Sequence, residues 1–539
     1  MSAYYLGIDV GSGSVRAGVF DGAGRCLAQR ACAIAQFRPA AAFVEQSSDD
    51  IWRACVQAVN EALDAAAIAR ESVRAIGFDA TCSLVAVGAD GAPVSVSPTD
   101  DDAQNIIMWM DHRATAEAET IAATGHEALR YIGGQVSPEL ELPKLLWLAR
   151  NRPDQYERAA MFLDLADYMV ARAVGALDSD KTPGKSVCTQ VCKWLYLAHE
   201  KRWPTDLLAD IGLESLLDKP RMTGPIREPG APAGHLTPAV AEAFGLRGDV
   251  VVATGLIDAH AGALGMLGDD PEAGLAVIAG TSTCHIAFSR APCFVPGVWG
   301  PYWGAVLPDG WINEGGQSAV GALIDHVIAD SAAGTALMAE ADARGMSHFD
   351  VLNARLDAME AEHGAPTLTR DVHVLDYHHG NRSPLADATL TGAFTGLTLG
   401  TRIDDLAVRY LATLQAVSYG TRHIIEALND NGHAVTRLRV CGGILKNERW
   451  LTETADAIGL PLEVPAETET VLLGSAMLAV TAAGDVPDLR AAAARMSRTA
   501  RVVEPRDERR SFHDAKYRVY RALHADSVGY RDIMASADI

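Results

Sequence analysis

Two glycine-containing turns, each between apolar segments, lie half a chain apart. The first is in residues 6–20 (LGIDVGSGSVRAGVF) and the second is in residues 276–288 (AVIAGTSTCHIAF) of the 539-residue chain. Both patterns predict a strand, a tight turn and a second strand. Glycine lets a backbone approach a ligand closely, and successive N–H groups of such a turn form a concave anion site. The pair therefore predicts two like domains that hold one polyphosphate from both sides.

Ordinary β-hairpins also favour Gly and Ser in their turns, so one hairpin of this kind has a purely structural interpretation as well. Two features favour phosphate binding here. The hairpin is repeated, and the first copy contains Asp9, whose carboxylate suits a metal ion beside phosphates.

The length and the charge of the chain limit what it binds. A chain of 539 residues exceeds the size at which one core keeps growing, about 250–300 residues, and so predicts at least two domains. The formal net charge of −23 argues against nucleic acid or an anionic membrane as a partner. We expect a cytoplasmic enzyme whose anionic ligand is held by backbone groups and a metal ion.

Neither the cysteines nor the N-terminus indicates export or membrane insertion. The nine cysteines are odd in number and include no Cys-x-x-Cys pair, which predicts reduced thiols rather than disulfides or a zinc site. A strand is expected almost at the N-terminus, so no signal peptide is predicted. The longest apolar run, residues 471–484, is shorter than the about 20 residues that span a bilayer.

Alternating strand and helix patterns predict an α/β fold with a largely internal sheet. Buried strands are expected at residues 73–79 and 250–255. Residues 268–271 (GDDP) precede the second hairpin and form the best domain boundary. We predict an N-terminal domain over residues 1–268 and a C-terminal domain over residues 269–539.

Two common phosphate-binding motifs are excluded. Residues 184–186 (GKS) end like a P-loop, but Ser179 occupies the position of its first glycine and no apolar strand precedes it. Gly11-x-Gly13 begins like a dinucleotide fingerprint. Arg16 stands at its third glycine position, however, and the turn leads into a strand rather than a helix.

Five segments together resemble the FGGY family of carbohydrate kinases, and the resemblance covers about residues 4–485. The segments are the first hairpin with Asp9, residues 254–260 (TGLIDAH), residues 279–283 (AGTST), residues 379–384 (HGNRSP), and Gly442-Gly443 with Asn447. The resemblance implies an α/β fold of two actin-like, ribonuclease-H-like ATPase domains with a catalytic cleft between them.

Four further segments are most similar to D-ribulokinases within that family. They are residues 108–114 (MWMDHRA), 133–138 (GGQVSP), 143–148 (PKLLWL) and 192–196 (CKWLY). L-ribulokinases share part of this pattern, so L-ribulose and other ketoses or polyols stay open as substrates. One position departs from the family: Glu141 stands three residues before Lys144, where the family signature prefers Pro, Ser or Thr.

The resemblance implies that ATP phosphorylates a sugar hydroxyl with the help of Mg²⁺. Asp258 would be the catalytic base and, with Asp9, would hold the metal; each aspartate could instead serve only a cap or a turn. Phosphoryl transfer needs positioning, charge neutralisation and only modest proton transfer. The phosphate-binding residues would be Gly11, Ser12 and Ser14 of the first hairpin and Gly280, Thr281 and Ser282 of the second.

The sugar would be bound by residues that resemble the contact positions of ribulokinases, namely Trp109, Lys193 and Glu314, together with Asp258. Weaker candidates are Asp79, Asp111 and Arg113. Arg113 could instead form an ion pair with Glu117, four residues on. His112 and His260 are expected to be structural.

By the same resemblance, Gly442, Gly443 and Asn447 would line the adenosine pocket. The two glycines allow a planar base to lie against the backbone, and Asn447 has an amide for the purine or ribose. Residues 474–476 would either close this pocket or pack tightly as part of a helix.

The expected reaction is phosphorylation of a ketopentose, D-ribulose above others, at C5 to give D-ribulose 5-phosphate. ATP and Mg²⁺ are the expected cofactors, and a homodimer is the expected assembly. An actin- or chaperone-like nucleotide switch would leave Trp109, Lys193 and Glu314 without a role. A non-catalytic sugar-binding relative would not need both Asp9 and Asp258.

Overall fold

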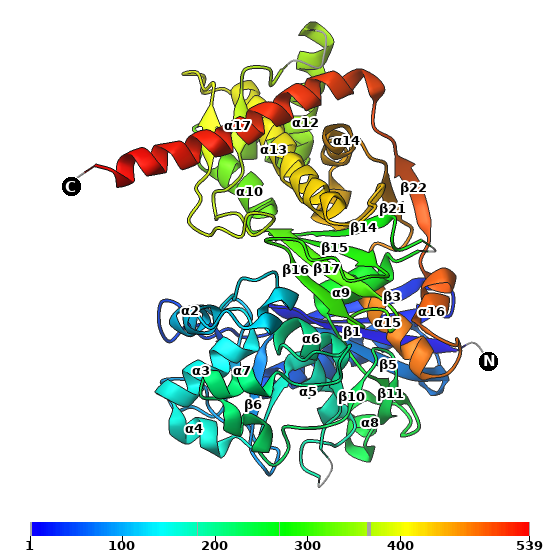
Figure 1. Cartoon of the computed structure of the whole chain (residues 1–539). Helices are drawn as coiled ribbons and strands as arrows, with labels where there is room; N and C mark the ends of the chain where they lie inside the picture. Colours follow the sequence, from blue (N-terminus) through cyan, green and yellow to red (C-terminus); the bar gives the residue numbers. More distant parts are fainter. Residues whose placement is uncertain (1–2, 180–181, 269, 364–367, 538–539) are drawn as a thin grey trace.

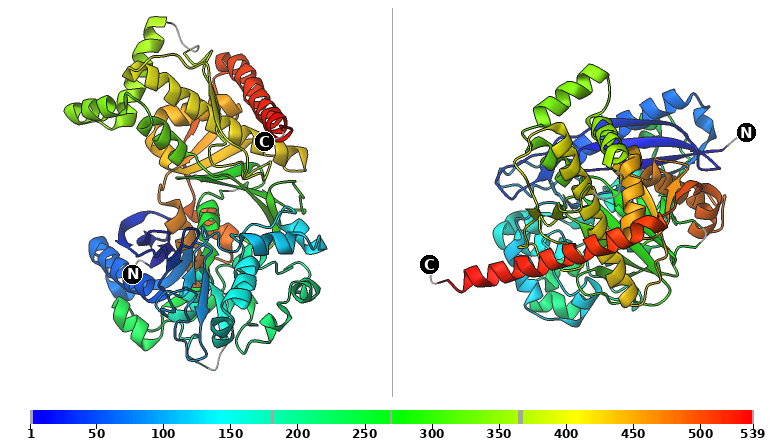
Figure 2. Two further views of the ribbon diagram at one scale, coloured as in Figure 1. Left: turned by 90° about the vertical axis from the view of Figure 1, so that its left-hand side faces the viewer. Right: turned by 90° about the horizontal axis from the view of Figure 1, so that it is seen from above.

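A computed structural model describes residues 3–179, 182–268, 270–363 and 368–537 of the chain. Figures 1 and 2 show two α/β halves stacked on each other, each built around its own sheet. Residue 269, part of the predicted domain boundary, lies outside the described residues. The two-domain α/β architecture expected from the repeated hairpin is confirmed.

The first sheet has the strand order β11-β12-β5-β1-β2-β3, and β13 also pairs with β5. β1, β2 and β3 form an antiparallel meander, whereas β5 and β12 run parallel to β1. The bounds are β1 Tyr4–Val10, β2 Ser14–Asp21, β3 Cys26–Ala33, β5 Val73–Ala80, β11 Pro232–His235, β12 Val251–Ala253 and β13 Leu256–Ile257.

The second sheet repeats this plan in the order β16-β17-β15-β14-β20-β21-β22. β14 and β15 form the second predicted hairpin, β17 extends it, and β20 and β21 continue parallel to β14. The bounds are β14 Gly274–Ala279, β15 Thr283–Ser289, β16 Trp299–Trp303, β17 Trp311–Gln317, β20 Arg437–Gly442, β21 Leu462–Pro465 and β22 Thr499–Val503.

Helices cover both sheets, and amphipathic patterns explain their docking. In α1 (Ser48–Ala66), Ser47 caps the N-terminus by accepting from the N–H of Asp50, and Ile51 and Cys55 are fully buried. Further helices are α3 Glu141–Asn151, α5 Leu165–Ala173, α10 Gly321–Ala329, α11 Gly334–Arg344, α12 His348–His363, α13 Ile403–Asp430 and α14 Glu448–Ile458.

Shorter elements complete both halves. The helices are α2 Thr115–Ala122, α4 Pro153–Arg158, α6 Val187–Lys193, α7 Thr205–Asp210, α8 Pro238–Phe244 and α16 Leu489–Met496. The strands are β4 Glu45–Gln46, β6 Leu84–Val87, β7 Ile106–Ile107, β8 Met161–Asp164, β9 Lys185–Ser186, β10 Ile226–Arg227, β18 His373–Leu375 and β19 Ala393–Thr395.

Two helices cross where the halves meet. α15 (Thr470–Ala482) comes late in the chain but packs against α9 (Asp258–Gly265) and against β1 and β5 of the first sheet. Glycine makes this contact close: a Cβ on Gly474 would lie 1.9 Å from the carbonyl oxygen of Ala261, and one on Gly77 would lie 1.9 Å from that of Ser475. Residues 474–476 therefore pack tightly as part of a helix, the structural one of the two roles predicted for them.

The last helix, α17 (Arg510–Ala535), packs on the second half through the buried side chains of Tyr517 and Tyr520. Its C-terminal end extends past the neighbouring helices in Figure 1. Within the described part of the chain, we find no helix with the length and apolar character that a membrane crossing requires.

Candidate active site

A cavity of about 370 Å³ opens where the turns of the two predicted hairpins meet. Its walls come from both halves of the molecule. Ten residues singled out in the sequence line it: Asp9, Gly11, Ser12, Trp109, Lys193, Asp258, Gly280, Thr281, Ser282 and Glu314. Groups that are up to about 300 positions apart in the chain are thus brought together at one site.

Each hairpin turn is closed by a backbone hydrogen bond from its first glycine, and the first turn is one residue longer than the second. The N–H of Gly11 donates to the carbonyl oxygen of Ser14 at 3.0 Å, and the N–H of Gly280 donates to that of Ser282 at 2.8 Å. Ser14 begins β2 beside the cavity wall formed by Gly11 and Ser12, and its contact with phosphate stays a prediction. Its carbonyl closes the turn.

Asp9 is held from two directions. Its Oδ2 lies 2.5 Å from Nη2 of Arg16, and its register partner on β5 is Asp79. Asp79 is fully buried, and its Oδ2 accepts a hydrogen bond from Ser475 Oγ at 2.6 Å. Burial and the charge of Asp9 raise the pKa of Asp79 well above its ordinary value. The predicted sugar contact by Asp79 is corrected: the side chain supports Asp9 and does not line the cavity.

Asp258 is the first residue of α9 and stands at the cavity wall. Its Oδ1 accepts a hydrogen bond from the N–H of Ala259 at 2.8 Å. Burial and the charge of Asp9 raise the pKa of Asp258 to about 6. A carboxylate with this pKa accepts a proton near neutral pH more readily than an exposed aspartate does.

Lys193 and Glu314 bring opposite charges to the same cavity. The ammonium of Lys193 lies 4.7 Å from the ring centroid of Trp299. Glu314 Oε2 lies 3.1 Å from Nε2 of His260. Burial opposes ionisation of Glu314, but the hydrogen bond from His260 and nearby positive charges lower its pKa to about 2. Glu314 is therefore an ionised acceptor at neutral pH.

The indole of Trp109 also faces the cavity, but its N–H is already engaged. Nε1 donates to Ser12 Oγ at 2.9 Å. Trp109 therefore presents an apolar ring to a ligand and links the sugar-binding region to the first hairpin.

The cavity residues that were not predicted include Glu139, Trp299 and Arg382. Arg382 Nη2 lies 3.6 Å from Glu139 Oε1, which joins the two halves across the cavity. Arg382 lies within the quoted segment 379–384, and Glu139 directly follows the segment 133–138. The motifs beside Glu139 and Arg382 were the signal that could have identified them. Hydrophobic periodicity could not, because loop residues follow no repeat that fixes the direction of a side chain.

Comparison with known proteins decides the family. The N-terminal domain of the FGGY family of carbohydrate kinases matches residues 4–265, and the C-terminal domain matches residues 275–483. The chain belongs to the FGGY family of carbohydrate kinases. It is an ATP-dependent sugar kinase, as the resemblance of its motifs implied.

Named relatives of the kinase extend over most of its length. The human FGGY carbohydrate kinase domain-containing protein is 42% identical over 98% of both chains. D-ribulokinase of Saccharomyces cerevisiae is 37% identical, covering 89% of this chain and 72% of the yeast protein. Ribulokinase of Shouchella clausii is 32% identical, covering 88% and 84%.

Solved structures show that the fold of the kinase is shared. Ligand-bound xylulose kinase from Lactobacillus acidophilus has a TM-score of 0.80 at 18% identity and covers 99% of both chains. Glycerol kinase from Plasmodium falciparum with ADP has a TM-score of 0.78 at 15% identity, covering 97% of this chain and 98% of the other.

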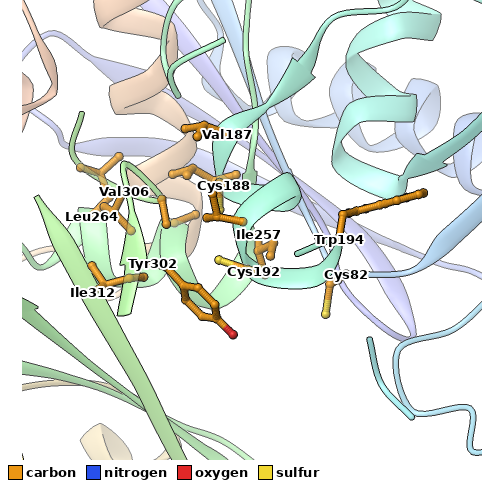
Figure 3. Close-up of a cluster of buried hydrophobic side chains, with 14 of the residues drawn as sticks. Cys82, Val187, Cys188, Cys192, Trp194, Ile257, Leu264, Tyr302, Val306 and Ile312 are labelled. Atoms are coloured by element: carbon orange, nitrogen blue, oxygen red, sulfur yellow. The ribbon is translucent and has the colours of Figure 1, made fainter. Parts of the chain in front are cut away.

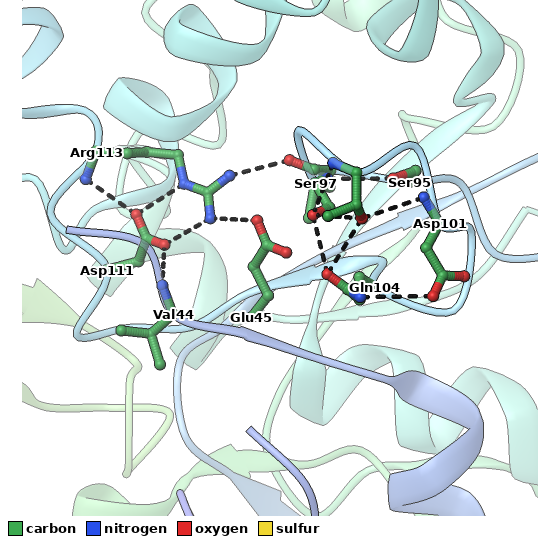
Figure 4. Close-up of polar contacts among 10 residues, drawn as sticks. Val44, Glu45, Ser95, Ser97, Asp101, Gln104, Asp111 and Arg113 are labelled. Carbon is green, nitrogen blue, oxygen red and sulfur yellow. Dashed lines mark hydrogen bonds and ion pairs between the residues drawn. The ribbon is translucent and has the colours of Figure 1, made fainter. Parts of the chain in front are cut away.

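Two predicted sugar contacts of the kinase belong to a buried ion network instead. Figure 4 shows Arg113 between Asp111 and Glu45, with Nη2 2.7 Å from a carboxylate oxygen of each. These side chains are fully buried and do not line the cavity. The predictions for Asp111 and Arg113 are corrected, because both charges are already paired. Glu117, the alternative partner of Arg113, lies 3.8 Å from Arg150.

Asn447, which we predict to contact adenosine, also has partners within the protein. Its Oδ1 accepts from the N–H of Trp450 at 3.3 Å and caps α14, while its Nδ2 donates to the hydroxyl of Tyr410 at 2.5 Å. Both ends of the amide are thus used within the protein. Gly442 and Gly443 are exposed and lie beside the second hairpin, where Gly442 pairs with Ala279. The contact of Gly442, Gly443 and Asn447 with adenosine stays a prediction.

Proposed function

We propose that this kinase transfers the γ-phosphoryl group of ATP to the C5 hydroxyl of D-ribulose, with Asp258 as the base. One observation carries the proposal: Asp258, with a pKa raised to about 6, shares one cavity with both hairpin turns and with Lys193 and Glu314. The relatives named D-ribulokinase and ribulokinase support the choice of sugar.

The hairpins provide the phosphate-binding groups of this proposal. Gly11 and Ser12 would contact the phosphates from the first half, and Gly280, Thr281 and Ser282 from the second. The exposed glycines of the second half, Gly442 and Gly443, would lie against the adenosine. In this division of labour, residues 1–268 provide the base, Lys193 and Trp109, and residues 269–539 contribute Glu314 to the sugar site and complete the ATP site.

Asp9 and Asp258 fit a Mg²⁺ site, because carboxylate oxygens are the ligands that this ion prefers. Both line the cavity, and the charge of Asp9 raises the pKa of Asp258, so a cation beside them would relieve an existing repulsion. When bound, Mg²⁺ neutralises charge on the phosphates. Arg16, 2.5 Å from Asp9, fixes the orientation of that carboxylate.

The sugar would lie among Lys193, Glu314 and Trp109. Lys193 donates hydrogen bonds, Glu314 accepts them, and the Trp109 ring covers an apolar face of the substrate. Asp258 receives the proton of the attacking hydroxyl. Arg382 and Glu139 join the two halves beside this pocket and so help to exclude water, which would otherwise compete as acceptor.

Acceptor-dependent release of ADP tests the proposal. We would compare kcat/KM for D-ribulose, L-ribulose, D-xylulose, ribitol and glycerol with ATP and Mg²⁺, and locate the phosphate in the product by ³¹P NMR. The proposal predicts a value for D-ribulose about tenfold or more above the others and a 5-phosphate product. Preference for another acceptor would refute the substrate, and release that no acceptor stimulates would refute the proposed transfer.

A further inference from the structure

Three buried side chains form a chain of contacts behind the proposed sugar site. Cys188 Sγ lies 3.1 Å from Nδ1 of His260, and Nε2 of the same ring lies 3.1 Å from Oε2 of Glu314. Cys188 and His260 are fully buried, and 9% of the Glu314 side chain is exposed at the cavity. The imidazole is therefore held at both nitrogens.

Each of these residues shares an element with the proposed chemistry. Cys188 lies on α6, which ends in Lys193, and His260 lies on α9, which begins with Asp258. Glu314 lies on β17 of the other half. Figure 3 shows Cys188 and Cys192 on α6, among the apolar side chains that surround it. His260 thus ties together the elements that carry the sugar-binding groups and the base.

The hydrogen-bond chemistry fixes the direction of the contact with Glu314. An ionised carboxylate can only accept, so Nε2 of His260 must carry the hydrogen. The proton between Cys188 and Nδ1 can reside on sulfur or nitrogen without changing this contact. Among the described residues, Glu314 receives a hydrogen bond at Oε2 alone, which leaves Oε1 for the cavity.

We propose that His260 is a positioning residue that holds the carboxylate of Glu314 towards the sugar, and that Cys188 fixes its ring. This inference rests on the proposed function, in which Glu314 contacts the acceptor. Without the hydrogen bond from His260, the buried carboxylate of Glu314 loses the contact that fixes its rotamer and stabilises its ionised form. The sugar, which depends on Oε1, would then bind more weakly, whereas ATP, held by the hairpins, would not.

A metal ion is the competing explanation of the cluster, because ligand atoms of Cys188, Cys192 and His260 lie within 4.8 Å of one another. Tetrahedral zinc geometry places sulfur and nitrogen ligands about 3.6 Å apart. The 3.1 Å between Cys188 Sγ and His260 Nδ1 is shorter and suits a direct hydrogen bond. The described residues also offer three ligands here, one fewer than a closed structural zinc site has.

The experiment compares His260→Leu with His260→Gln in the full-length kinase. Leu removes both ring nitrogens, whereas the Gln amide can donate to Glu314. We expect His260→Leu to weaken D-ribulose binding about tenfold or more, measured as KM and by calorimetry, with KM for ATP within about twofold of wild type. His260→Gln should recover most of the loss. His285→Leu is the matched control, a fully buried histidine whose Nε2 contacts Thr421 rather than a cavity residue.

Several results would overturn the inference. His260→Leu with wild-type affinity for sugar, or His260→Gln no better than His260→Leu, would exclude the positioning role. Equal loss of sugar and ATP binding would indicate general damage. Cys188→Ala keeps the imidazole and should show a smaller loss that is specific to the sugar. This variant tests the inference even if His260→Leu does not fold. One zinc per purified chain that disappears in Cys192→Ala would establish the metal site instead. Failure of the proposed function is distinct, since wild type would then show no D-ribulose-dependent release of ADP.

Discussion

At the scale of single residues, burial and neighbours give the acidic groups of the cavity different chemistry. Burial and the charge of Asp9 raise the pKa of Asp258 to about 6. The hydrogen bond from His260 and nearby cations keep the pKa of Glu314 at about 2 despite its burial. One carboxylate is thus suited to take up a proton and the other to remain an acceptor, a division that follows from environment rather than residue type.

The pKa of Asp258 predicts an acid limb in the pH profile. Below about pH 6 the carboxyl is protonated in the free enzyme and cannot accept the hydroxyl proton. We expect kcat/KM for MgATP, which reports the enzyme before Mg²⁺ binds beside the carboxylate, to fall about tenfold per pH unit there. Asp9→Asn removes the negative charge that raises the pKa of Asp258, so the acid limb of its residual activity should move to lower pH. A flat profile between pH 5 and pH 7 would contradict this assignment.

Sequence motifs predicted the residues that line the cavity well, but they did not predict the role of the buried residues behind them. Asp9, Asp258 and Glu314 stand in or beside short strands with glycine turns, where the direction of the chain limits where a side chain points. Asp79 and Asp111 stand in equally motif-like surroundings, yet one supports Asp9 and the other pairs with Arg113. Residue type alone does not distinguish a buried ion pair from a ligand contact, because both need the same charged groups.

At the scale of elements, the predicted hairpins are confirmed as β1–β2 and β14–β15. Apolar periodicity and turn glycines were sufficient for this, since a hairpin is a local structure. The packing of α15 on the first sheet was not predictable in the same way. It depends on contacts such as Gly77 with Ser475, between segments almost 400 residues apart.

The crossing of α15 and α9 predicts a steric effect at Gly474. An added Cβ would lie 1.9 Å from the Ala261 carbonyl oxygen, so one of the helices has to shift. We expect Gly474→Ala to lower the free energy of unfolding by about 2 kcal/mol. Gly248→Ala is the control, because nothing lies within 4 Å of its added Cβ, and its effect should stay within about 0.5 kcal/mol. Equal thermal or urea stability of the two variants would refute the close contact.

At the scale of the whole molecule, the site exists only because two halves share it. Asp258 and Lys193 come from the first half, Glu314 and Arg382 from the second, and the cavity lies between the hairpins of both. The family and the two-domain architecture were predictable, since the motifs that carry them recur along the chain. The bridge of Arg382 to Glu139 was not, because it depends on how the halves meet.

Turnover and ATP binding of Asp258→Asn test the central claim most directly. The substitution keeps the shape of the side chain but removes the carboxylate that would accept the proton. We predict a fall in D-ribulose-dependent ADP release of about 100-fold or more, with ATP affinity by calorimetry within about threefold of wild type. Turnover close to that of wild type would contradict the role of Asp258 as the base of this kinase.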